Sequence, residues 1–300
     1  MNELYAADPS ACKHSSDLQL LLRSFGPFTG RYLANYPSDW TSKVRSALAA
    51  TGEVEEKRIK LLLQRARDDS TLIERLPFAW NPAKSWIENA SNLIYGSHPQ
   101  LSGIISDKTN PPFIQPLDEL DLPPTAEERI PGKSTEYLRI SDILIKQSTE
   151  LFFIDPYLNP LTTRYRNTIK AFLFSAAGGR CQSIQFWMRA SELFKHGSRG
   201  ATMTDLKNEL RAWSKMVKFR NGAQLQVFAV EDEASREKMH GRYLLSKKGG
   251  IRLDQGFQEL PQDRKVEVGP IGKHPLSDLL SIYLDGNHDM KVVEHANIVF

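Results

Sequence analysis

Cysteine is almost absent from this chain, and its scarcity excludes two classes of small protein. The chain contains only Cys12 and Cys181, with no Cys-x-x-Cys pair and no cluster of cysteine with histidine. Disulfide frameworks and structural zinc sites need more thiols at closer spacing. We therefore expect no disulfide framework and no metal, and nothing in the sequence calls for a cofactor.

Long apolar runs are also missing. No segment approaches the roughly 20 apolar residues that cross a bilayer. The start, Met1-Asn2-Glu3-Leu4, lacks the basic and apolar stretches of a secretory signal. We expect a cytoplasmic protein with no membrane span.

The chain has little excess charge of either sign. It carries 39 Lys and Arg against 36 Asp and Glu, a formal net charge of +3. With 300 residues, 40% of them hydrophobic, it has the composition of a folded protein of two domains or one large one. Such a mild positive balance allows nucleic acid as a partner without requiring it, so a local basic surface would have to provide the binding.

The first 95 residues show helical patterns. Apolar residues recur at helical spacing over 17–22, 38–48 and 54–76, and Asn81-Pro82 is typical of a further helix start. We predict a helical domain over 1–95 and expect it to contact other protein subunits.

Residues 96–136 differ in composition from what precedes them. Seven prolines fall between positions 96 and 135, with acidic residues among them. Proline interrupts helices and central strands, so this segment is interpreted as a linker or an extended strap between two domains.

Residues 137–300 alternate between two patterns. Short apolar runs typical of buried strands occupy 151–154, 183–188, 225–230, 242–246 and 250–253. Helical patterns lie between them, over 164–177 and from 204 to 217. Alternating strands and helices predict an α/β domain, here with a mixed, mostly parallel sheet.

One segment in this region has residue types suited to phosphate chemistry. His240 and Arg242 stand two residues apart at the start of the strand predicted over 242–246, and residues two apart on a strand point to the same side. Covalent phosphodiester chemistry needs a nucleophile, a proton donor and cations around the developing charge. No other histidine here is followed two residues later by Lys or Arg. A single imidazole is also compatible with a purely structural residue.

Three segments together resemble the phospholipase D-like superfamily, most closely the phospholipase D-like C-terminal domain of MIT-domain proteins and its prokaryotic relatives. Phe153-Ile154-Asp155-Pro156-Tyr157-Leu158 is similar to the opening strand and turn of that domain. His240-Gly241-Arg242-Tyr243-Leu244-Leu245 is similar to its histidine strand, and 250–257 to the return strand that follows. The resemblance covers about residues 140–270 and implies a phospholipase D-like domain over 137–300.

The resemblance implies a site, and the sequence departs from it at three positions. It implies catalytic roles for His240 and Arg242, conditional on a dimer that supplies a second histidine. Gly241 stands where Asp is common, Arg242 where an active enzyme has Lys, and Lys247 where the motif has Asp. The expected ligand-binding residues are Asp155, Tyr157, Arg164, Lys195, Arg199, Lys247, Lys248 and Arg252. Asp155-Pro156 is also compatible with a simple strand-ending turn, and the basic loop over 195–200 with ordinary solvated charge.

Three functions remain open from the sequence. The first is a degenerate module that binds a phosphate-bearing ligand, most plausibly nucleic acid, within a prokaryotic multi-protein defence or DNA-processing complex. The second is a homodimeric, metal-independent phosphodiesterase or nuclease with His240 in a composite site. The third is a protein-interaction scaffold that has lost phosphate affinity.

Overall fold

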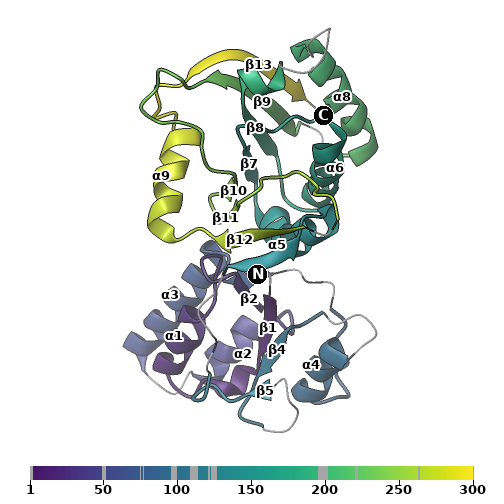
Figure 1. The fold of residues 1–300 in the computed structure, drawn as a ribbon. Helices are drawn as coiled ribbons and strands as arrows, with labels where there is room; N and C mark the ends of the chain where they lie inside the picture. The colour runs from purple at the N-terminus through teal and green to yellow at the C-terminus, as the bar shows by residue number, and fades with distance from the viewer. Residues whose placement is uncertain are drawn as a thin grey trace. The chain divides into compact units, whose positions relative to one another are not determined.

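The chain is described by a computed structural model covering residues 3–48, 52–74, 76, 78–95, 100–108, 114–120, 122, 127–194, 202–219, 222–262 and 264–299. It divides into two compact units, Met1–Thr125 and Ala126–Phe300, which are described separately (Figure 1). No helix within these ranges has the length and apolar character that a bilayer crossing requires.

The N-terminal unit is an α/β domain built on a parallel sheet. Its described strands pair in the order β3-β2-β1-β4-β5, and each of these pairings is parallel. The elements are β1 (Glu3–Ala7), η1 (Pro9–Ala11), α1 (Ser15–Arg23), β2 (Arg31–Ala34), α2 (Trp40–Ala47), α3 (Glu53–Asp68), β3 (Leu72–Ile73), α4 (Trp86–Tyr95), β4 (Gly103–Ile105) and β5 (Ile114–Gln115).

The helices predicted over 1–95 are present, but short strands between them make this region part of an α/β domain. The expected helices correspond to α1, α2 and α3, but α3 ends at Asp68, and β3 follows within the span expected to be helical. Asn81 starts a turn, not a helix, because its side chain accepts the Ala83 amide at 2.9 Å, and α4 begins only at Trp86. The strands have two to five residues, too short for a periodic pattern to separate them from helix ends.

The linker predicted over 96–136 is also not a simple strap. It contains β4 and β5 of the first sheet, and then β6 (Glu128–Pro131) and the start of α5 (Ser134–Gln147) of the second unit. Pro131 is tolerated because β6 is an edge strand, where one side of the backbone needs no ladder partner. The boundary between the units lies at Thr125, about ten residues before the predicted domain start.

The C-terminal unit contains a mixed sheet. Its described strands pair in the order β13-β9-β8-β7-β10-β11-β12-β6. The remaining elements are β7 (Glu150–Ile154), α6 (Thr163–Ala177), β8 (Ser183–Arg189), α7 (Ala190–Leu193), α8 (Met203–Val217), β9 (Gln224–Glu231), β10 (Tyr243–Ser246), β11 (Gly249–Leu253), β12 (Lys265–Pro270), α9 (Lys273–Tyr283) and β13 (Lys291–Val299).

The α/β class and the mixed sheet are confirmed, but the expectation of a mostly parallel sheet is wrong. Only the β7–β8 and β8–β9 pairings are parallel, and the other described pairings are antiparallel. The reason is chain length: β10, β11 and β12 follow one another without intervening helices, and short connections permit only antiparallel neighbours.

Helices cover the two faces of this sheet unequally (Figure 1). On one face, α5, α6 and α8 pack over buried residues such as Phe153, Phe186 and Val227. On the other face, α9 packs on β10 and β11, where Leu276 and Tyr283 join a core cluster with Phe152 and Leu245. The side of the sheet on which α9 packs is called the α9 face. On β9 and β13 this face is only partly covered, since Phe228 is half-buried and His295 is exposed.

Candidate functional site

Strand register brings together the two motifs that the sequence singled out. In the antiparallel β7–β10 pair, Tyr243 lies opposite Ile154, so the next residues along each strand, Arg242 and Asp155, lie opposite each other. Arg242 Nε is 3.9 Å from Asp155 Oδ1, an ion pair that is too long for a hydrogen bond. The Asp-Pro-Tyr turn and the histidine strand therefore form one site.

The Arg242 guanidinium is held from three sides. Its Nη1 donates to the Asp254 carbonyl at 2.6 Å, and its Cζ lies 5.1 Å from the centroid of the Tyr157 ring. The side chain stays 25% exposed. A guanidinium oriented in this way keeps N–H groups available for an anion, and its position does not depend on one contact.

Backbone amides hold the Asp155 carboxylate in a tightly packed site. Its carboxylate accepts the Tyr157 amide at 2.9 Å and the Phe257 amide at 3.3 Å. Phe257 is fixed by rings packed around it, with centroids 5.3 Å from Phe153 and 6.0 Å from Phe172. The turn after β11, which carries Phe257, therefore covers the carboxylate and supplies its second backbone hydrogen bond.

Burial raises the pKa of the Asp155 carboxyl. The carboxyl is fully buried, and desolvation raises its pKa from 3.8 to about 6, although the two amides, Arg242 and Arg164 act in the opposite direction. Because the pKa of Asp155 is higher in the folded state than in the unfolded state, the folded protein binds more protons than the unfolded chain between about pH 4 and pH 6. The stability that this group contributes is complete below about pH 4 and is lost as the pH rises through about 6.

This shift predicts a pH-dependent difference between the wild type and Asp155→Asn, which cannot titrate. From pH 4 to pH 7, the free energy of unfolding of the wild type should fall by about 2 kcal/mol relative to the variant. Urea denaturation at several pH values measures the difference. The exposed carboxylate of Asp278 on α9 provides the control, Asp278→Asn. A pH-independent difference for Asp155→Asn would contradict the prediction.

His240 is exposed and lies in the loop before β10, three residues ahead of Tyr243, and a further ion pair holds this loop in place. Arg189 bonds Asp232 with both guanidinium arms, Nε to Oδ1 at 2.8 Å and Nη2 to Oδ2 at 2.9 Å. The same two side chains bind the backbone of Met239: Arg189 Nη2 donates to its carbonyl at 3.0 Å, and its amide donates to Asp232 at 2.8 Å. Both polar backbone groups of Met239, the residue before His240, are therefore hydrogen-bonded.

The sequence reasoning missed Arg189 and Asp232, although a signal for them existed. Arg189 ends β8 and Asp232 follows β9, just as Asp155 follows β7. These three strands are parallel neighbours, so their carboxyl ends meet at one edge of the sheet. Burial raises the pKa of Asp232, but Arg189 and the Met239 amide outweigh that effect and lower it below the ordinary value.

A cavity of about 440 Å³ opens beside this site. It is lined by His240, Gly241, Arg242, Tyr243, Arg252, Leu253, Asp254 and Glu267. Arg252 is paired with Glu127, and Glu267 lies 3.6 Å from Arg129. Among these lining residues, His240 is the only imidazole. The cavity thus offers one histidine and two guanidinium groups, with Arg242 the more deeply set of the two.

The other predicted ligand-binding residues lie at different places in the C-terminal unit, and not all of them reach this site. Arg164 is exposed at the start of α6, with its Cζ 5.1 Å from the Tyr165 ring centroid. Lys247 and Lys248 lie in the β10–β11 turn at the opposite end of β10, where Lys247 pairs with Glu150 at 2.9 Å. They do not join the site, because a four-residue strand separates them from Arg242 by roughly 13 Å or more. Lys195 and Arg199 lie outside the described residues.

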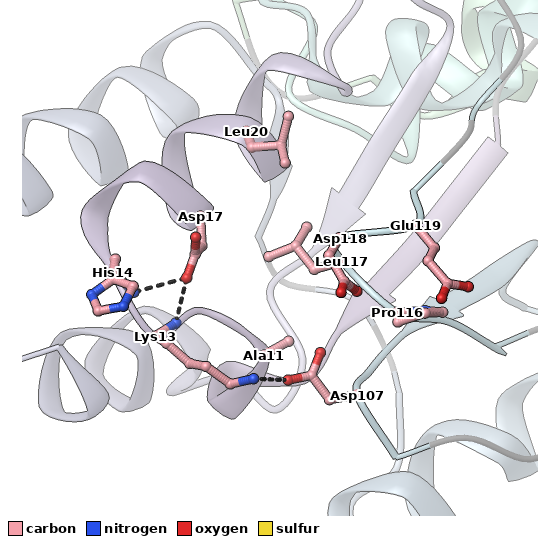
Figure 2. Close-up of a pocket in the computed structure, with 10 residues that line it drawn as sticks. All are labelled: Ala11, Lys13, His14, Asp17, Leu20, Asp107, Pro116, Leu117, Asp118 and Glu119. Carbon is pink, nitrogen blue, oxygen red and sulfur yellow. Dashed lines mark hydrogen bonds and ion pairs between the residues drawn. The ribbon is translucent and has the colours of Figure 1, made fainter.

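A second cavity, of about 530 Å³, lies in the N-terminal unit (Figure 2). It is at the carboxyl ends of β1 and β4, where the strand order reverses and α/β folds commonly bind ligands. However, Asp17 accepts the Lys13 and His14 amides at 2.9 Å each, so a carboxylate already occupies the start of α1. Lys13 pairs with Asp107 at 2.8 Å. With Asp118 and Glu119 also lining it, this cavity disfavours phosphate.

Comparisons with known proteins do not identify a family. No protein-family profile matches the chain, and no curated protein does. Among solved structures, one match is an archaeal chromatin protein, TrmBL2, whose structure is described as showing a novel mode of DNA binding. The identity is 10% and the TM-score 0.30, over 83% of this chain and 87% of that one. A likeness at this level carries no argument about fold or function.

Proposed function

We propose that the C-terminal unit is a phospholipase D-like module that holds a phosphate-bearing ligand, specifically a nucleic acid strand, at Arg242 and His240. The observation that carries the proposal is the Arg242 guanidinium, held by the Asp254 carbonyl, the Tyr157 ring and Asp155 at the wall of the cavity beside exposed His240. A fixed guanidinium matches the geometry of a phosphate diester better than a flexible ammonium does.

Binding is favoured over hydrolysis for a chemical reason. The chemistry suggested by the resemblance needs one histidine to attack phosphorus and a second to protonate the leaving oxygen. The described lining of the cavity holds His240 as its single imidazole. A binding module that acts within a multi-protein complex, with the N-terminal unit contacting other subunits, is consistent with this arrangement.

The test is binding of a fluorescent DNA duplex and a single strand across a range of salt concentrations, measured by anisotropy. Arg242→Ala should weaken binding about tenfold and reduce the salt slope by about 1, because one phosphate contact is lost. Arg242→Lys should recover only part of the affinity, since an ammonium cannot bind a phosphate in the bidentate manner. Arg180→Ala is the matched control, because Arg180 is exposed and precedes β8 at the opposite end of the sheet.

Two results would count against the proposal. Equal affinities for the wild type, Arg242→Ala and Arg180→Ala would remove phosphate binding from this site and leave the scaffold function. DNA hydrolysis that persists in chelator and disappears in His240→Ala would replace the binding module with a homodimeric phosphodiesterase.

A further inference from the structure

The α9 face of β8, β9 and β13 carries an ordered row of rings. Strand register aligns Trp187, Phe228 and His295 across the three strands. Trp187 and Phe228 stack with centroids 4.3 Å apart at 12°, and Phe228 and His295 stack at 4.6 Å and 27°. The rings therefore face one another in a continuous stack that runs across the sheet.

The stack is closed at one end and open at the other. Trp187 is buried beneath Tyr283 of α9 and beside His288, with centroids 5.3 and 5.5 Å away. Phe228 is half-buried and His295 is exposed. His295 lies on β13, the edge strand of the described sheet, and Phe228 is the one ring that stacks on it among the described residues. No strand of the described sheet therefore lies on the side of His295 away from Phe228.

A row of amide side chains runs beside the row of rings. Gln185 lies opposite Gln226, and Gln226 lies opposite Asn297, one step along the same face. Asn297 is exposed, and the two glutamines are half-buried. Trp187 at one end of this face belongs to the core cluster under α9, whereas the amide row and His295 lie outside it. Amides beside stacked rings suit base edges, which donate and accept hydrogen bonds in their own plane.

Positive charge gathers at the same edge. A cavity of about 540 Å³ between α8 and β13 is lined by Arg211, Lys215, Lys218, Phe219, Asn297, Ile298 and Val299. The three basic residues recur at helical spacing along one side of α8 and its C-terminal cap. No carboxylate is among the described lining residues. Asn297 lines this cavity and also belongs to the amide row, so the cationic surface on the α8 side meets the ring face at the edge strand β13.

From these features we infer that the exposed edge of this sheet binds single-stranded nucleic acid, with a base stacked on His295 and the backbone phosphates along Lys215 and Lys218. Stacking and backbone charge are the two elements of strand binding without strong sequence preference. A duplex does not fit this mode, because its bases are already stacked on one another. The inference rests on the proposed class of ligand, but its residues are separate from His240 and Arg242.

The experiment compares two single-stranded probes of about 16 nucleotides, oligo-dT and an abasic backbone of equal length, with a duplex. Wild type should bind oligo-dT about tenfold more tightly than the abasic strand. His295→Ala should abolish that preference, and His295→Phe should retain it because the ring is restored. His274→Ala is the matched control, since His274 is an exposed imidazole on α9 in the same unit. A 2-aminopurine base should be quenched by the wild type and not by His295→Ala.

Charge is tested separately with Lys215→Ala combined with Lys218→Gly. Lys218 has a φ of 52°, which glycine adopts without steric cost, so this variant should fold. It should weaken the binding of both single-stranded probes equally and lower the salt slope by about 0.7 for each lysine.

Each alternative outcome is distinguishable. Equal binding of oligo-dT and the abasic strand, or an unchanged preference in His295→Ala, would overturn the inference. Protection of β13 amides in a concentration-dependent dimer would assign this edge to a second copy of the chain. Loss of binding in Arg242→Ala, with the preference for oligo-dT absent from the wild type, would leave the proposed function intact and remove only this surface.

Discussion

Gly256→Ala is expected to lower the free energy of unfolding of the C-terminal unit by about 3 kcal/mol. Gly256 has a φ of +68°, a left-handed conformation that costs a residue with a Cβ about 1 kcal/mol. A Cβ at this position would also lie 2.9 Å from Arg242 Cδ and in direct overlap with the Asp155 carboxylate. The carboxylate is fully buried and held by two amides, so it cannot move away without losing them.

The glycine also positions the site, so the substitution should affect binding as well as stability. Displacing Asp155 moves a partner of Arg242, and we expect Gly256→Ala to bind DNA as weakly as Arg242→Ala. Hydrogen exchange of peptides from β7 and β11 would locate the loss of stability.

Gly286→Ala is a matched control for this variant. Gly286 also has a positive φ, +74°, but no atom lies within 4 Å of a Cβ built there. It should cost only the backbone penalty of about 1 kcal/mol. Equal losses in the two variants would show that the contact with Asp155 is unimportant.

Asp232→Ala is expected to be comparably damaging, at about 3 kcal/mol. Asp232 is 3% exposed and accepts both arms of Arg189, whose side chain is 19% exposed. Removing the carboxylate leaves a largely buried guanidinium without its partner and the Met239 amide without its acceptor. We place the effect at the low end of the range for broken buried pairs because Arg189 keeps some contact with water.

A neighbouring pair supplies the control. Glu231 pairs with Lys291 at 2.9 Å, but both side chains are at least half exposed. Glu231→Ala should change the free energy of unfolding by no more than about 0.5 kcal/mol. Urea denaturation would measure both variants. The double variant Arg189→Met with Asp232→Leu should recover only part of the loss, because an apolar pair carries no unpaired charge but leaves the Met239 amide without its acceptor. If Asp232→Ala is as mild as Glu231→Ala, the pair does not hold the loop before His240.

The sequence alone determined much of the C-terminal unit. The strands at β7, β8 and β9 and the helices at α6 and α8 are long apolar or periodic segments, which local patterns identify directly. The resemblance singles out Asp155 and Arg242, and the register of β7 with β10 does bring them together. Their phosphate-binding role remains a proposal.

Only the tertiary structure decided the rest, because it depends on contacts between residues distant in the chain. The five-stranded sheet of the N-terminal unit is made of strands too short to carry a period, and its strands are defined by pairing with one another. Lys247, in contrast, was predicted from its place in a motif, yet the turn after β10 carries it to the far end of the strand. Strand register also decided two other features, because no local pattern contains it. One is the pair of hydrogen bonds by which Arg189 and Asp232 hold Met239. The other is the ring stack from Trp187 to His295.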